Sequence, residues 1–219
     1  CELVCFVLRN LSASKPNTAA IVEHIDPLVA ALAAHIDNEH IASGACAVLL
    51  NIAIVKEQCA ALCQRPVVRA LAHAAGRHAG SADICQDAVA ALANIAAVDA
   101  ARDMLLDEGV MPLLAALLHA HADGSETLCQ SICWALRNLT NYKEACAVLW
   151  AQDGAVADLC RALAAHTGSL AICVFCSWSL CNLFAEHECP ADLLAAAVVP
   201  AMLAALASHD ANASLKKAV

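Results

Sequence analysis

Five asparagines recur along this sequence at nearly equal intervals, each inside a similar apolar phrase. They are Asn10, Asn51, Asn94, Asn138 and Asn182, and the steps between them are 41, 43, 44 and 44 residues. An amide side chain carries both a donor and an acceptor, so it can hydrogen-bond the backbone of an extended peptide twice. In the alternative interpretation, each amide bonds the backbone of a neighbouring helix and only stabilises stacking. The spacing leaves both roles open.

Aromatic and charged residues accompany these asparagines. Phe6, Trp134 and Trp178 stand four residues before an Asn, which places them on the same face of a helix, one turn away. The face of an indole ring attracts cations, so the two tryptophans could flank a Lys or Arg side chain; core packing is the alternative. Asp87 makes the same face acidic in the middle of the chain, and Arg137 stands next to its Asn.

The regular spacing indicates a repeat protein, because a fixed period of about 20–50 residues is typical of solenoids and propellers. Hydrophobic residues make up 61% of the chain and aromatic residues only 3%. Alanine and leucine dominate, and both enter helices at little cost, whereas so few aromatics argue against a β-sandwich or barrel. We therefore expect helices and no sheet.

Each period is predicted to hold a short, a medium and a long helix. Asn38, Ser81 and Ser125 are expected to precede the long helices, and Gly109 suits the end of a short one. We expect a single array with the last helix of a truncated repeat at 1–13, repeats at 14–55, 56–98, 99–141 and 142–186, and an incomplete repeat at 187–219. We also expect the chain to be part of a longer protein, and its terminal helices, 1–13 and 211–219, to be the least covered and least stable.

Two segments make the family resemblance specific. The phrase GVMPLLAALL at 109–118, followed by CWALRNL at 133–139, resembles an armadillo repeat, and the five Asn phrases extend this resemblance over the whole chain. The resemblance implies an all-α fold, a right-handed α-solenoid (superhelix) of armadillo repeats. The glycine before the second helix is present only at Gly109 and Gly154. HEAT repeats are the alternative, but their two-helix units leave the Asn column unexplained.

The resemblance also implies a function. In armadillo proteins the third helices line a concave groove into which the Asn side chains point, so we expect a protein–protein interaction scaffold that binds an extended partner segment. The residues expected in this groove are Asn10, Asn51, Asn94, Asn138, Asn182, Trp134, Trp178, Phe6, Arg137 and Asp87.

Three alternatives to this function stay open. A purely structural array within a longer cytoskeletal or ciliary scaffold would fill or cover its groove residues. An importin-α-like carrier of basic peptides would use the Trp–Asn pairs, although Arg9 and Arg137 would disfavour such peptides if they point inward. An enzyme could also carry its catalytic domain elsewhere.

Composition and motifs narrow the possible partners. A formal net charge of −9 disfavours a nucleic-acid surface, which needs a basic stripe. No phosphate-binding loop, nucleophile elbow or paired-carboxylate site is present, so we expect no catalysis and no cofactor. The partner is expected to be a protein or extended peptide, and the oligomeric state is undetermined.

The cysteines and one uncharged stretch need separate explanations. Fourteen cysteines at helical core spacings are interpreted as reduced thiols of a cytoplasmic or nuclear protein. The Cys173–Cys176 pair lies in an apolar helix and is not expected to bind metal. Residues 167–185 carry no charge, but they contain a repeat phrase and are interpreted as a buried helix, so no membrane span is expected.

Overall fold

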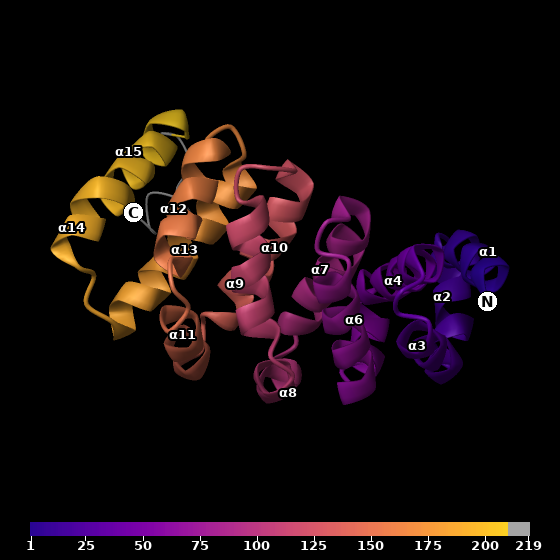
Figure 1. Cartoon of the computed structure of the whole chain (residues 1–219). Coiled ribbons are helices and arrows are strands. Elements are labelled where there is room, and N and C mark those ends of the chain that lie inside the picture. The colour runs from indigo at the N-terminus through magenta and orange to yellow at the C-terminus, as the bar shows by residue number, and fades with distance from the viewer. Residues whose placement is uncertain (210–219) are drawn as a thin grey trace. The chain divides into compact units, whose positions relative to one another are not determined.

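The computed structural model describes residues 1–209 of the 219-residue chain, and within them every regular element is helical. This confirms the predicted all-α class. The chain divides into two compact units, one spanning Cys1–Val110 and the other beginning at Met111 (Figure 1). We describe each unit by itself.

The first unit consists of helices in the expected short, medium and long sequence. They are α1 (Glu2–Ser12), α2 (Lys15–Val22), α3 (Ile25–Ala34), α4 (Glu39–Ala53), α5 (Lys56–Cys59) with the 3₁₀ turn Ala60–Leu62, α6 (Arg65–Arg77), α7 (Ala82–Ala96), and the 3₁₀ turn Asp99–Ala101 leading into α8 (Arg102–Asp107).

The core of this unit lies around its long helices. In Figure 1, α1, α4 and α7 follow one another from indigo to magenta, and α4 contacts both of the others. The medium helices α3 and α6 pack against α4 and α7, respectively, and against each other. Leu49, Ile52, Leu92 and Ile95 are completely buried between these helices. Burial of each long helix against its neighbours explains why its apolar residues extend beyond a single stripe.

Local signals explain how several helices begin and how short helices end. The Asn38 side chain accepts a hydrogen bond from the Ile41 backbone N–H, and the Ser125 hydroxyl accepts one from Leu128, as an N-cap residue should. Ser81 precedes α7 without such a side-chain bond. Gly109 and Gly154 have φ values of +70° and +77°, which a residue with a side chain rarely adopts, so glycine suits both turns.

The second unit continues the same helical sequence. Its helices are α9 (Val110–His121), α10 (Glu126–Leu139), α11 (Lys143–Trp150), α12 (Ala155–Ala165), α13 (Leu170–Glu186), α14 (Ala191–Leu193) with the π-helical turn Leu194–Val198, and α15 (Val199–Ser208).

The uncharged stretch at 167–185 coincides largely with α13. This helix packs against α10, α11 and α12, and seven of its residues are buried, among them Ile172, Leu180 and Leu183. Packing on several sides therefore accounts for its apolar sequence. A different stretch, Ala191–Ser208, is long and apolar enough to cross a membrane by length and composition, with a mean hydropathy of 1.9. Part of that stretch packs against α12.

The first helix is less covered than the other long helices of its unit. Among its apolar residues, Leu3, Val4, Phe6, Val7 and Leu11 are exposed and only Cys5 is buried. The expectation for the helix at 211–219 lies outside the described residues.

Candidate functional site

Each long helix carries its recurring asparagine near its C-terminal end. Asn10 on α1 is exposed, whereas Asn51 on α4, Asn94 on α7 and Asn182 on α13 are half-buried. Asn138 on α10 is buried, with only 5% of its surface exposed. Three of the five amides are therefore partly accessible and one is largely covered.

Two of these amides bond the helix of the preceding repeat. In the first unit, Asn51 Nδ2 donates to the Ser12 hydroxyl at 2.9 Å. In the second unit, Asn182 Nδ2 lies 3.4 Å from both Thr140 Oγ1 and Asn141 Oδ1. These bonds join neighbouring long helices, as the stacking interpretation of the asparagines expects.

Asn94 and Asn138 each have a hydrogen bond within their own helix. Asn94 Nδ2 donates to the Ala90 carbonyl at 2.8 Å, four residues back. Asn138 Oδ1 accepts from Arg137 Nη1 at 3.0 Å. The Arg137 guanidinium thus lies on the Asn138 amide, which opposes a second cation at that position.

The aromatic positions differ between the two units. Phe6 is 58% exposed on α1, while Trp134 on α10 and Trp178 on α13 are half-buried. At the equivalent places on α4 and α7 stand Ala47 and Ala90, which are buried. The second unit therefore presents indole surface one helical turn before its asparagines, and the α4–α7 pair does not.

A cavity of about 390 Å³ opens on the predicted groove face of the first unit. Its lining comes from α1 and α4: Glu2, Leu3, Phe6, Arg9, His40, Ser43 and Gly44. The two helices approach closely here, since a Cβ placed on Gly44 would lie 2.8 Å from the Cys5 Cβ. Glycine at this position therefore allows α1 and α4 to pack closely.

Charges near this face interact across the first unit. Burial raises the pKa of the Asp87 carboxyl, the positive charge of Arg9 lowers it, and the negative charge of Asp83 raises it further. The net shift is upward, so burial outweighs the attraction to Arg9. Asp87 and Arg9 thus place opposite charges on α7 and α1.

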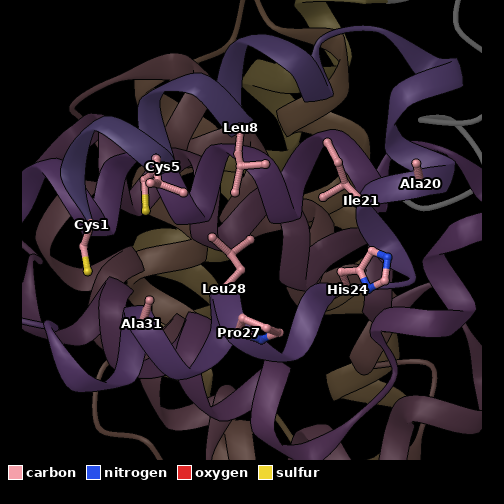
Figure 2. Close-up of a pocket in the computed structure, with 10 residues that line it drawn as sticks. Cys1, Cys5, Leu8, Ala20, Ile21, His24, Pro27, Leu28 and Ala31 are labelled. Carbon is pink, nitrogen blue, oxygen red and sulfur yellow. The ribbon is translucent and has the colours of Figure 1, made fainter.

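A second, apolar pocket of about 460 Å³ lies between α1, α2 and α3 (Figure 2). Cys5, Leu8, Ile21 and Leu28 point toward its centre in the close-up, and His24 lies at its edge. Aliphatic and sulfur-containing side chains dominate the lining. The pocket has few polar groups that could orient a ligand, which a small-molecule site needs.

The cysteines are unpaired, as the sequence predicts. All fourteen fall within residues 1–209, none forms a disulfide, and ten are buried. Burial raises the pKa of several thiols, for example Cys59, Cys85 and Cys160, to about 11. Among the described residues, no group of three or more His, Cys, Asp or Glu side chains could hold a metal ion.

Sequence reasoning did not identify Ser12 and Thr140 as the partners of the asparagines. Each follows the Asn of its own repeat by two residues, so a hydroxyl at that fixed offset was the available signal. Sequence reasoning also did not predict that Asn138 would be buried while Asn182 stays partly accessible.

Comparisons with known proteins agree with this architecture. The family model described as Armadillo/beta-catenin-like repeat matches residues 99–141. No sequence of a functionally curated protein is significantly similar to the chain.

Solved structures extend the likeness over nearly the whole chain. Computationally designed armadillo repeat proteins for modular peptide recognition are 25% identical, with 96% of this chain and 87% of that chain covered and a TM-score of 0.74. A designed armadillo repeat protein in complex with the peptide (KR)4 is 23% identical, with 98% and 87% covered and a TM-score of 0.71. These findings confirm the predicted fold: the chain is an all-α solenoid of armadillo repeats.

Proposed function

We propose that this chain is a non-enzymatic interaction scaffold that holds an extended segment of a partner protein against the long helices of its repeats. The support from relatives is that similar designed armadillo proteins are described as recognising peptides. The partner is a protein or a peptide, and the groove residues are those predicted from the Asn column.

The observation that carries this proposal is a stripe of accessible residues along long helices that are otherwise mostly buried. On α13, Val174, Trp178 and Asn182 are partly accessible at spacings of four residues, while the residues between them are mostly buried. On α7, Asp87 and Asn94 lie on the corresponding stripe. A polar amide on an accessible stripe of an apolar helix is placed to meet a ligand rather than the core.

The cavity lined by α1 and α4 supports the same surface as the binding site. It lies on the face that contains Phe6, and its lining includes the acidic Glu2 and the basic Arg9. A few charged groups beside apolar walls are typical of sites that fix the orientation of a ligand.

The stacking role of the asparagines is the competing function, and the hydrogen bonds of Asn51 and Asn182 favour it. The two functions make different predictions for one variant. If the amide serves a ligand, Asn182→Ala lowers peptide affinity by about 1 kcal/mol, the value of a net hydrogen bond, and barely changes stability. If the amide only joins repeats, the same change lowers the free energy of unfolding and leaves affinity intact.

A display experiment tests the proposal without a known partner. A library of random dodecapeptides is selected on the folded chain, and each enriched peptide is titrated against the wild type, Asn182→Ala and the control Asn17→Ala. Asn17 is an exposed amide on α2 that donates to the Leu11 carbonyl, away from the accessible stripes. Selective weakening by Asn182→Ala supports the groove. Enrichment of no peptide, or equal binding to all three proteins, refutes it.

We also propose that the protein works in the cytoplasm or nucleus, since a reducing compartment would keep its fourteen thiols unpaired. Alkylation of thiols at the moment of cell lysis tests this: labelling of all cysteines only after reduction would contradict it.

A further inference from the structure

The hydroxyls that accept hydrogen bonds from the Asn51 and Asn182 amides occupy equivalent places in the two units. Ser12 follows Asn10 by two residues, and Thr140 follows Asn138 by two residues. Both hydroxyl residues are buried, with 2% of their surface exposed. The same hydrogen bond between neighbouring repeats is therefore built twice, from different residues, once in each of the two units.

Each hydroxyl has a fixed direction, because its single proton is already used. Ser12 Oγ donates to the Arg9 carbonyl at 2.9 Å, and Thr140 Oγ1 donates to the Arg137 carbonyl at 3.3 Å. Only the lone pairs of the hydroxyl remain, so the neighbouring amide must present its Nδ2 group. Asn141 acts in the same way: its Nδ2 donates to the Asn138 carbonyl, which leaves its Oδ1 to accept from Asn182.

This direction decides what the asparagine offers to a ligand. The amide oxygen and nitrogen branch from one planar carbon, so when Nδ2 faces the preceding repeat, Oδ1 points in a different direction, away from the hydroxyl. Within the described residues, no protein group donates to Oδ1 of Asn51 or Asn182. Each of these half-buried amides therefore keeps an unused carbonyl acceptor.

The remaining interface of the first unit shows the hydroxyl's effect by contrast. The position two residues after Asn51 is Ala53, which is as buried as Ser12 but has no hydroxyl. Asn94, which would face it, donates instead to the Ala90 carbonyl of its own helix. The amide thus bonds across to the preceding repeat where a hydroxyl is present and to its own helix where alanine replaces it.

We propose that Ser12 and Thr140 are positioning residues that hold Asn51 and Asn182 with the amide carbonyl turned toward a ligand, where it accepts from a backbone N–H of the bound segment. This inference rests on the proposed function, since it needs a peptide at the Asn column. A side chain fixed before binding loses less freedom when the ligand arrives, so positioning raises affinity without adding a contact.

Peptide affinity in a double-mutant cycle tests the role of Thr140. The probe is the tightest dodecapeptide from the display selection, titrated by fluorescence anisotropy. Thr140→Val keeps the shape but removes the hydroxyl, and we expect it to weaken binding about three- to tenfold. Thr140→Ser should restore affinity, and Thr140→Val should have no further effect when Asn182→Ala is already present. Unchanged affinity, or an equal loss in the Asn182→Ala background, overturns the proposal.

A ligand-free measurement separates this proposal from the proposed function. Hydrogen exchange and relaxation of the Asn182 side-chain amide, followed by NMR, report its immobilisation directly. Thr140→Val should speed exchange at Asn182 and leave the Asn94 amide unchanged, because Asn94 is held by its own helix. If Thr140→Val does not fold, Ser12→Ala read at Asn51 in the first unit replaces it. An unaffected amide refutes positioning even if peptides bind, and a freed amide with no selectable peptide refutes only the proposed function.

Discussion

Gly44→Ala tests the close approach of α1 and α4 because two known effects oppose each other there. Alanine is the better helix former, by about 1 kcal/mol in a helix interior. However, the added Cβ would lie 2.8 Å from the Cys5 Cβ and 3.2 Å from the Cys5 carbonyl carbon. The packing of this helix pair decides which effect is larger.

The distances give the size of the steric cost that opposes this gain in helix propensity. Carbon atoms pack best at about 3.5–4.0 Å, so relief of the contact with Cys5 requires a shift of at least about 0.7 Å. Overpacking of this kind costs about 1–3 kcal/mol, because the neighbours must move off their preferred positions. The nearest obstacle is the root of a side chain and its backbone, which cannot rotate away. We expect Gly44→Ala to be neutral or to destabilise the protein by up to about 2 kcal/mol, after its gain in helix propensity is subtracted.

Urea denaturation measures the net effect, with Gly76→Ala as the control. Gly76 is exposed on α6, so alanine there should show the gain in propensity alone. Hydrogen exchange should quicken in α1 and stay unchanged in α7, since α1 can yield by moving away. If Gly44→Ala stabilises the protein as much as Gly76→Ala does, α1 and α4 do not pack as closely at Gly44 as these distances indicate.

Three further predictions concern the groove face and the thiols. Trp178→Ala should weaken binding of the selected peptide by about 2 kcal/mol and change the melting temperature little. A loss of folding stability of about 3–5 kcal/mol with peptide affinity intact would instead assign the indole to the core. Asp87→Asn should raise the free energy of unfolding at neutral pH, because burial lifts the pKa of Asp87 in the folded protein above its ordinary 3.8 and the charged carboxylate therefore opposes folding. This gain in stability should vanish in acid below pH 3.8, and a gain that grows on acidification would contradict the prediction. Maleimide at neutral pH should label the exposed Cys1 and Cys181 quickly. The buried cysteines should react only after denaturation, because burial shields them and raises their pKa values, so they stay protonated. Rapid labelling of most cysteines in the folded protein would refute their burial.

The sequence predicted the helices well because local chemistry decides them. Asn38 and Ser125 cap their helices as their side chains suggest, and Gly109 and Gly154 form the turns directly before the medium helices α9 and α12. The first short helix, α2, begins at Lys15 and has Pro16 inside its first turn. Proline lacks only an N–H that has no partner there, so it starts a helix as readily as it ends one.

The geometry of the site was harder to predict than the fold. The Asn column identified which residues share a face, but not which amide would be covered, since that depends on the side chain beside it. Asn138 is buried and accepts a hydrogen bond from Arg137, whereas Asn182 stays partly accessible. Such differences come from rotamers and from contacts between helices about 40 residues apart, which a single sequence does not encode locally.

The paired amide and hydroxyl also bear on how such an array can grow by gene duplication. The bonded residues are 39 residues apart in the first unit and 42 in the second, close to one period. A repeat that carries both residues has an amide that can donate to the repeat before it and a hydroxyl that can accept from the repeat after it. A duplicated segment of one full period therefore arrives with both halves of the bond, wherever its ends fall. At Ala53 the hydroxyl is absent, and the adjoining Asn94 amide bonds its own helix instead, so a joint of this array can pack without the bond.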